Sequence, residues 1–338
     1  MSSTSSSASS HFRALPLLLA LAAAGATACA DARGSEGDTA ASRPVALASA
    51  PAAERSAASA PSAASAALTL LTAPDEFFTR GGVSIRYRVI GQGEHALLVH
   101  GYSDKVEMWA GTADSLARDF RVIVPDVRDF GRSSKPDGVG AYGQEMVDDL
   151  VALLDHLGVR QAHLVGYSMG GLLSANMALR YPDRVRTATM VAGAFWSDSA
   201  TMQRDLAPYV AALERGERLT SFLKYIVPTL SDADAASFSD QLFAENDSSA
   251  LVDVLKSIPA ITPDWKKAVS TRIPAVTVVG LPDPLHVNAR LFASRWPGAK
   301  LVELPEGDHI AITNAPEVAR ELRLIARGAS SAGVAAAR

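Results

Sequence analysis

The sequence contains a single cysteine, Cys29, among its 338 residues. A lone cysteine cannot form an internal disulfide bond, so the fold is expected to rest on its hydrophobic core alone. The net charge is -4 and no basic stripe is visible, which argues against nucleic acid as a partner. Histidines and carboxylates are not grouped at the spacing of metal ligands, so we expect neither a metal nor another cofactor.

Long apolar runs are also scarce. The apolar run near the N-terminus, Leu15–Ala24, is too short to cross a bilayer of about 30 Å as a helix. It follows a serine-rich start with His11 and Arg13, and it ends in small residues before Cys29. This order is typical of a secretory signal peptide. We therefore predict that residues 1–29 direct export.

The end of this segment, Gly25–Cys29, resembles a bacterial lipobox. The resemblance implies that Cys29 takes a lipid, becomes the mature N-terminus and attaches the protein to a membrane. Ala26 stands where such boxes usually carry leucine, and it also suits an ordinary cleavage site. Both a cell-envelope lipoprotein and a freely secreted protein therefore stay open.

Composition divides the remaining chain. Residues 30–67 are mostly Ala, Ser, Pro and Gly, and offer too little apolar surface to offset the entropy of ordering them. We expect a disordered tether there, and a frayed tail at residues 328–338. Residues 68–327 are of a normal size for one α/β domain with an insertion.

Several short runs rich in β-branched residues alternate with helical patterns, which predicts an α/β fold with a mostly parallel sheet covered by helices on both faces. The expected strands are Val83–Ile90, His95–His100, Arg121–Pro125, Gln161–Gly166, Ala188–Gly193, Ala275–Gly280 and Lys300–Leu304. The expected helices are Met108–Phe120, Tyr142–Leu157, Met169–Tyr181 and the segment from Pro316 through Ile325.

The alternation breaks between Trp196 and Arg272, where helical patterns occur without a convincing strand. We predict a helical cap at residues 197–269, inserted between core segments 68–196 and 270–327. A separate helical domain is the alternative, but a domain of this length would have a marginal core. The expected cap helices are Met202–Arg215, Leu219–Ile226, Ala233–Ala244 and Ser249–Ile258.

The segment Gly166–Gly170 reads G-Y-S-M-G, directly after the apolar strand residues His163–Val165 and directly before a helical run. A strand, a sharp turn with small residues and a helix are the context of a nucleophile elbow. Ser168 would project its hydroxyl at the N-terminus of the helix, where peptide N–H groups favour developing negative charge. Ser168 is therefore the candidate nucleophile.

A serine nucleophile needs a base and an orienting acid further along the chain. Asp283 follows the strand that ends at Gly280, and His309 lies on the loop after the next strand. We predict Asp283 as the acid and His309 as the base. Asp283 could instead cap the following helix, with Asp198 as the rival acid, and His309 could be a surface histidine. Asp308 adjoins His309, but a sequence neighbour on a loop usually points elsewhere.

An oxyanion hole needs two backbone N–H groups, one after the nucleophile and one from an early loop. Met169 supplies the first group. Tyr102, after the strand that ends at His100, is predicted to supply the second, with Gly101 letting the backbone approach the ester oxygen. The prediction concerns the backbone of Tyr102, and its side chain could serve only in packing.

In these motifs the sequence resembles the α/β-hydrolase family, in its capped, esterase-like branch. The early turn H-G-x is His100–Tyr102, the loop D-x-R-G-x-G-x-S is similar to Asp126–Ser133, and the elbow is Gly166–Gly170. Two departures are Asp129, where glycine is usual and whose presence leaves the shape of the loop open, and Asp308, inserted in what is often a Gly-His pair. In this family, dehalogenases and epoxide hydrolases carry aspartate as the nucleophile, so the serine argues against both.

The resemblance implies hydrolysis of an ester, thioester, lactone or amide, or cleavage of a carbon–carbon bond next to a ketone. An apolar pocket wall would favour small or medium apolar esters, and we predict a carboxylesterase. A non-catalytic binding protein of the same fold is the rival class. The aromatic residues that could line the pocket are Phe195, Trp196, Phe222, Tyr225, Phe238, Phe243 and Trp265, of which we expect one or two to face substrate.

Overall fold

The computed structural model describes residues 68–336. The predicted export signal with Cys29 and the predicted tether lie outside the described residues. Within residues 68–336, no helix combines the length and the apolar character needed to cross a membrane.

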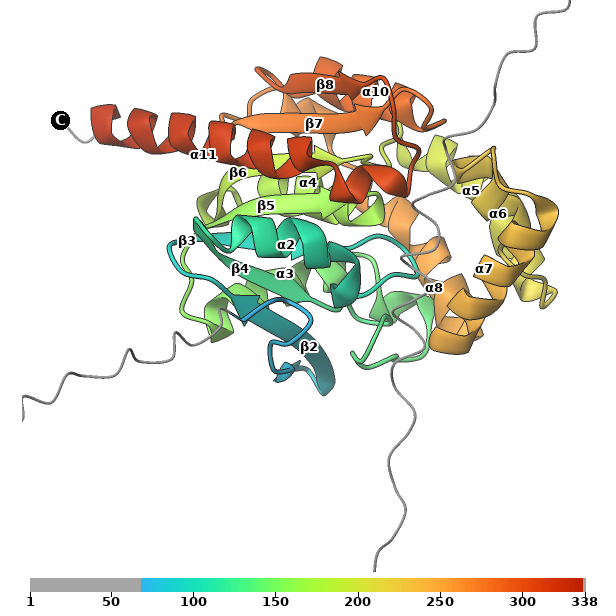
Figure 1. Cartoon of the computed structure of the whole chain (residues 1–338). Helices are drawn as coiled ribbons and strands as arrows, with labels where there is room; N and C mark the ends of the chain where they lie inside the picture. The colour runs from blue at the N-terminus through green and yellow to red at the C-terminus, as the bar shows by residue number, and fades with distance from the viewer. Residues whose placement is uncertain (1–67, 337–338) are drawn as a thin grey trace, which may run out of the picture. The chain divides into compact units, whose positions relative to one another are not determined.

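An eight-stranded sheet forms the centre of the molecule, in the order β1-β2-β4-β3-β5-β6-β7-β8 (Figure 1). The first two strands run antiparallel to their neighbours, and the remaining strands are parallel. The strands are β1 Glu76–Arg80, β2 Val83–Ile90, β3 Glu94–Val99, β4 Phe120–Pro125, β5 Ala162–Tyr167, β6 Val185–Val191, β7 Ala275–Gly280 and β8 Lys300–Leu304. The predicted α/β fold with a mostly parallel sheet is confirmed.

Helices cover both faces of this sheet (Figure 1), as predicted. The covering helices are α2 Ala110–Leu116, α3 Gln144–His156, α4 Met169–Arg180, α10 His286–Arg295 and α11 Pro316–Ala336. Helices α2 and α11 share one buried cluster with the apolar side chains of one sheet face, whereas α3, α4 and α10 share a second cluster with the other face. Each buried strand thus contacts apolar side chains on both of its sides, which is why the strand sequences are almost continuously hydrophobic.

Three local differences from the sequence prediction stand out. Strand β1 was not predicted; it pairs antiparallel with β2 at the sheet edge and buries little more than Phe78. The expected helix Met108–Phe120 is a 3₁₀ turn, Val106–Trp109, followed by the short α2. Helix α11 continues to Ala336, into the tail that was expected to be frayed.

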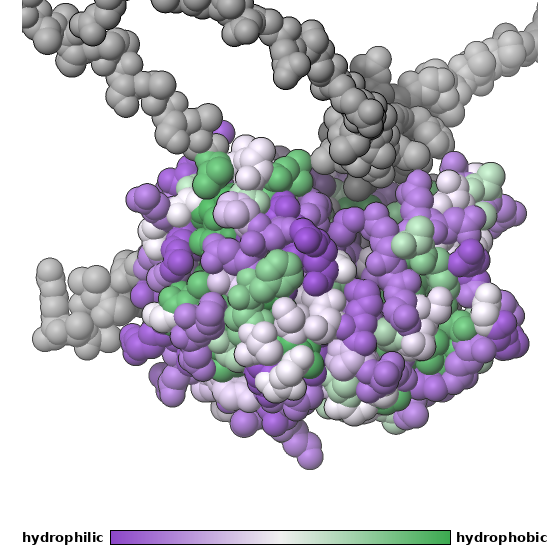
Figure 2. Space-filling model, turned by 90° about the horizontal axis from the view of Figure 1, so that it is seen from below, coloured by the Kyte–Doolittle hydropathy of each residue, from purple (hydrophilic) through white to green (hydrophobic). Residues whose placement is uncertain are grey.

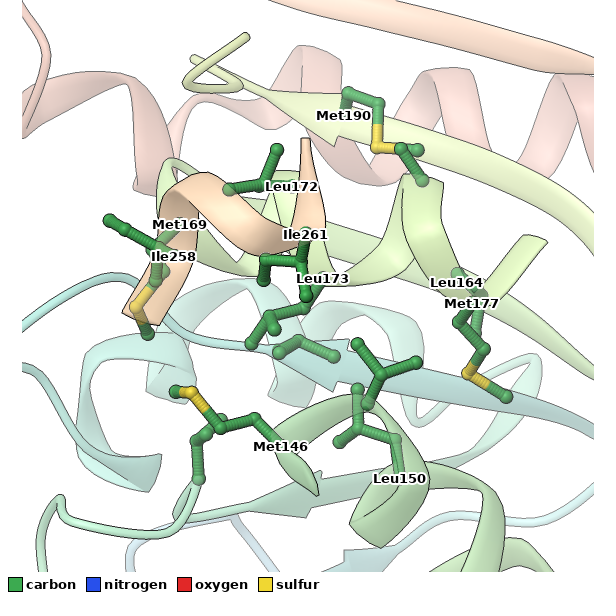
Figure 3. Close-up of a cluster of buried hydrophobic side chains, with 14 of the residues drawn as sticks. Met146, Leu150, Leu164, Met169, Leu172, Leu173, Met177, Met190, Ile258 and Ile261 are labelled. Carbon is green, nitrogen blue, oxygen red and sulfur yellow. The ribbon is translucent and has the colours of Figure 1, made fainter. Parts of the chain in front are cut away.

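The insertion between β6 and β7 is entirely helical. Its elements are α5 Ser199–Glu214, α6 Thr220–Ile226, α7 Asp232–Glu245, α8 Ser248–Ser257, the 3₁₀ turn η4 Ile258–Ile261 and the short α9 Trp265–Ala268. Met169 and Leu172 of α4 lie beside Ile258 of η4 (Figure 3) and belong to one hydrophobic cluster with it. The apolar core of the sheet therefore continues into the inserted helices, which we call the cap.

Polar contacts also join the cap to the main domain. The Tyr102 hydroxyl donates to the Leu251 carbonyl at 2.9 Å, and the Asn246 amide donates to the carbonyl of Ser103 at 3.2 Å.

The outer surface is mixed: on the face in Figure 2, hydrophilic side chains surround small hydrophobic patches. The extensive apolar contacts of the cap are thus directed inward, over the carboxyl ends of the strands.

Candidate active site

Ser168 stands on the sharp turn between β5 and α4. Its backbone has a φ of 50° and a ψ of -114°, a conformation that L-residues rarely adopt and that the surrounding structure must hold. The Ser168 N–H donates to the Val191 carbonyl at 3.0 Å, and the Ser168 carbonyl accepts from Ala194 N–H at 3.2 Å. The end of β6 therefore fixes the turn from both sides.

Glycines make the turn sterically possible. A β-carbon on Gly166 would lie 2.3 Å from the Gly170 carbonyl oxygen, and one on Gly170 would lie 2.2 Å from the Val99 carbonyl oxygen. Both distances are far below van der Waals contact, so neither position accepts a side chain. The small residues predicted around the elbow are thus required by close backbone approach.

The structure brings Ser168, His309 and Asp283 together. His309 Nε2 lies 3.0 Å from Ser168 Oγ, and His309 Nδ1 lies 2.8 Å from Asp283 Oδ2. Asp283 is fully buried and His309 is 2% exposed. The three side chains follow the carboxyl ends of β5, β7 and β8. In the sheet, β6 lies between β5 and β7, and β8 is the next strand after β7.

The chemistry of the carboxylate determines which atom donates in each of these two hydrogen bonds. The Asp283 carboxylate accepts from Nδ1–H of His309, which leaves the Nε2 lone pair facing the Ser168 hydroxyl. The second oxygen of Asp283 accepts from Leu285 N–H at 2.8 Å and so keeps the carboxylate in place. An imidazole held in this tautomer can accept the hydroxyl proton, and the carboxylate can stabilise the resulting imidazolium.

The rival acids have other partners. Asp198 caps α5 by accepting from Thr201 N–H at 2.8 Å, and hydrogen bonds from Ser197 and Thr201 lower the pKa of its carboxyl to about 2. Asp308 accepts from Ile310 N–H at 3.0 Å and from Ala311 N–H at 2.8 Å. Both carboxylates thus hold turns of the chain, while Asp283 contacts the histidine.

The early loop lies against the serine turn. A β-carbon on Gly101 would be 3.4 Å from the Ser168 β-carbon and 2.8 Å from the Tyr167 ring. His100 fixes this loop, because its Nε2 accepts from Val127 N–H at 2.9 Å and its Nδ1 therefore donates to the Gly101 carbonyl at 2.7 Å. Tyr102 follows directly in this loop.

Met169, on the other side of Ser168, is the first residue of α4. Its N–H is one of the first four of that helix, which have no acceptor within the helix. The backbone segments of both predicted oxyanion donors therefore flank Ser168, and the dipole of α4 adds positive potential there.

Ser168 opens into a cavity of about 580 Å³ between the main domain and the cap. Of the predicted aromatic residues, Phe195, Trp196, Phe222 and Tyr225 line it. The other three are not among the lining residues, and two of them have other partners: the Trp265 ring packs against Phe195 and Phe292, and Phe243 lies 4.7 Å below the Arg218 guanidinium. The Tyr102 side chain also lines the cavity, in addition to contacting the cap.

Sequence reasoning missed the polar residues of the cavity wall, among them Asp205, Tyr209 and Asn288. Asp205 accepts a hydrogen bond from Trp196 Nε1 at 3.0 Å. In the sequence it is one of several charged residues on an amphipathic helix, and no local signal separates it from a solvated neighbour. Among residues 68–336, no cluster of three or more His, Cys, Asp or Glu side chains could hold a metal ion.

Asp129, the departure from the family pattern, has a backbone φ of 84° and is fully buried. Its N–H donates to the Ser134 carbonyl at 3.0 Å, which preserves the turn. Within the described residues neither of its carboxylate oxygens has a hydrogen-bond partner. Burial raises the pKa of the Asp129 carboxyl to about 7, and the charges of Asp247 and Asp253 in the cap act in the same direction, against Lys135.

Comparison with known proteins places this site in a family context. Residues 95–316 match the family described as alpha/beta hydrolase fold. A fluoroacetate dehalogenase from Burkholderia sp. is 38% identical over 109 residues, which are 31% of this chain and 36% of that protein. The acetyltransferase component of an acetoin cleaving system from Pseudomonas putida is 28% identical over 249 residues, 70% of this chain and 65% of that protein.

The match to these curated relatives is partial, since these two alignments span 36% and 65% of the relatives' own lengths. Among solved structures, a thermophilic esterase from Thermogutta terrifontis superposes with a TM-score of 0.63 at 24% identity, over 76% of this chain and 99% of that one. That likeness concerns the fold alone. Because the family match covers residues 95–316, the chain belongs to the alpha/beta-hydrolase family.

Proposed function

We propose that the protein is a serine hydrolase that cleaves carboxylic esters through Ser168, His309 and Asp283. The observation that carries this proposal is the continuous hydrogen-bond chain from the Ser168 hydroxyl through the imidazole to the buried carboxylate. Each link lies within the distance at which a proton can be transferred. A serine held at a strained turn, at a helix N-terminus and below a cavity, is what nucleophilic attack on a bound ester requires.

In the first half of the reaction, Ser168 Oγ attacks the ester carbonyl carbon while His309 Nε2 takes the hydroxyl proton. The negative charge on the carbonyl oxygen is stabilised by the N–H groups of Tyr102 and Met169. As the carbon–oxygen bond to the alcohol breaks, the imidazolium returns the proton to the departing oxygen. The products of this step are a free alcohol and an acyl group on Ser168.

In the second half, a water molecule takes the place of the alcohol. His309 accepts its proton, the hydroxide oxygen attacks the acyl carbon, and the proton returns to Ser168 as the carboxylic acid leaves. The apolar cavity favours an ester with a small or medium apolar group. Lactone, amide and carbon–carbon substrates remain alternatives, because the same residues would act on each of them.

The test is reaction with a labelled fluorophosphonate and hydrolysis of p-nitrophenyl acetate, measured on the wild type and on Ser168→Ala. We expect labelling of the wild type only, and a loss of turnover on the order of 10³-fold or more in the variant. Ser294→Ala, an exposed serine of α10 outside the cavity, is the matched control and should retain both properties. A wild type that neither reacts nor hydrolyses, yet binds apolar esters, would support the non-catalytic alternative.

From the sequence pattern of residues 1–29 we also propose that the protein is exported, either anchored to the cell envelope through a lipid on Cys29 or secreted. The support for anchoring is the position of Cys29 directly after the apolar run. Stable attachment needs more than one acyl chain, because a single chain binds a bilayer only marginally.

A further inference from the structure

One wall of the cavity, built by the cap and by the segment after β6, is rich in aromatic rings. We call Trp196, Tyr209, Phe222 and Tyr225 the aromatic wall; all four line the cavity. The rings of Tyr209 and Phe222 meet edge to face with centroids 5.2 Å apart, and the centroids of Tyr209 and Tyr225 are 6.1 Å apart. The rings of Tyr209, Phe222 and Tyr225 are therefore contiguous, and Trp196 lines the same cavity.

A carboxylate lies at this wall. Asp205 accepts a hydrogen bond from the indole of Trp196 at 3.0 Å, and on α5 it is one turn away from Tyr209, so both side chains lie on the same helix face. Asp205 contacts Arg204 at 3.3 Å on the solvent side, where the Arg204 side chain is 71% exposed. Arg204 is not among the residues that line the cavity.

The formal charge on the side chains that line the cavity is negative. Of the described residues that line it, Asp205 alone carries a full charge, and neither lysine nor arginine is among them. Burial, together with the negative charges of Asp205 and Asp283, raises the pKa of Tyr225. A substrate anion would find no cationic side chain among the lining residues, whereas a cation would meet aromatic side chains and a carboxylate.

We propose that the aromatic wall and Asp205 form a subsite for an organic ammonium group carried by the substrate. Ring faces attract cations through their quadrupole, and aromatic side chains are a common means of recognising quaternary ammonium groups. This proposal rests on the proposed function and adds to it a substrate class, an apolar ester that bears a positive charge at the end remote from the scissile bond.

The test uses three small probes of nearly equal shape and different charge: choline, 3,3-dimethylbutan-1-ol and 3,3-dimethylbutanoate. Their binding is measured by calorimetry on the Ser168→Ala protein, and their competitive inhibition of p-nitrophenyl acetate hydrolysis on the wild type. At low salt we expect choline to bind about tenfold more tightly than the alcohol. The anion carries its charge at the opposite end from its tert-butyl group, so it reports on the end of the cavity near the predicted oxyanion donors. The preference should fall at about 1 M salt, where the screening length is about 3 Å.

Variants separate the two parts of the subsite. Asp205→Asn should reduce the preference for choline over the alcohol by about threefold, and Tyr209→Leu should reduce it further by a similar factor. Asp240→Asn is the matched control, because Asp240 is an exposed cap carboxylate paired with Arg218 at 3.0 Å and is not a lining residue. It should leave the probe order and the hydrolysis of p-nitrophenyl acetate unchanged.

Equal binding of choline and the alcohol, or an unchanged preference in Asp205→Asn, would overturn the subsite, and Asp205 would then serve only to hold Trp196. These outcomes are independent of catalysis, because calorimetry needs no turnover. Charge-ordered binding without any ester hydrolysis would support the subsite and refute the proposed function. Hydrolysis without charge-ordered binding would do the reverse.

Discussion

Replacing Asp129 by asparagine should stabilise the protein at neutral and alkaline pH. Asp129 is fully buried, and its carboxylate lacks hydrogen-bond partners among the described residues. An unpaired charge in such a position opposes folding because it loses its hydration without gaining contacts. Asparagine has nearly the same shape and carries no charge, so the substitution isolates the contribution of the charge to the free energy of unfolding.

The magnitude follows from the carboxyl pKa, which burial raises from 3.8 to about 7. This difference of roughly three pH units corresponds to about 4 kcal/mol at full ionisation. Because the folded pKa is higher than the unfolded one, the folded state holds its proton more tightly. The wild type is therefore expected to lose stability as pH rises from about 4 to about 7, and to stay at the lower value above that range.

The assay is urea unfolding followed by tryptophan fluorescence, on wild type and Asp129→Asn at several pH values. The free energy of unfolding should be similar for both below about pH 4, and the variant should gain about 2–4 kcal/mol above about pH 7. Asp155→Asn, an exposed carboxylate, is the control and should change stability by less than about 0.5 kcal/mol throughout. A difference between Asp129→Asn and wild type that does not vary with pH would refute the reasoning.

Further expectations concern the site and the N-terminus. Asp283→Asn should lower turnover strongly, whereas Asp198→Asn should be mild; kcat for p-nitrophenyl acetate would show the reverse if the acid were misassigned. Gly101→Ala should lower kcat about tenfold or more, because its β-carbon would come within 2.8 Å of the Tyr167 ring and displace the predicted oxyanion donor; an unchanged kcat would exclude this loop from catalysis. Cys29→Ser should release active protein from the membrane fraction, and wild type found free in the medium with its N-terminus past Cys29 would contradict lipidation.

The catalytic residues could be predicted where a local motif, or the order of strands along the chain, determines their position. Ser168 could be found because the elbow needs small residues within a few positions, so the signal is local. Asp283 and His309 could be found because each follows a strand, and the carboxyl ends of parallel strands meet at one edge. Their separation of 26 residues did not matter, since the strand order brings them within 2.8 Å of each other.

Other features depend on tertiary contacts that leave no local pattern. In the sequence, Asp205 cannot be distinguished from other charged residues of an amphipathic helix. It becomes part of the cavity wall because α5 packs near Ser168 in the folded protein. Asp129 was noticed as a departure from the family pattern, but its complete burial leaves no local sequence signal. Strand β1 was missed because an edge strand with one buried side chain has neither alternation nor an apolar run.

The placement of the cap between β6 and β7 has an evolutionary consequence. These strands are parallel hydrogen-bonded neighbours, so the insertion leaves the sheet at the carboxyl end of β6 and returns at the amino end of β7. Ser168 precedes the insertion, while Asp283 and His309 follow it, so the reacting groups are encoded outside the inserted helices that line one part of the cavity. Exchange of the whole segment by recombination could therefore change selectivity while the chemistry is inherited intact. The cap is therefore the segment to exchange between related proteins when a new substrate specificity is sought.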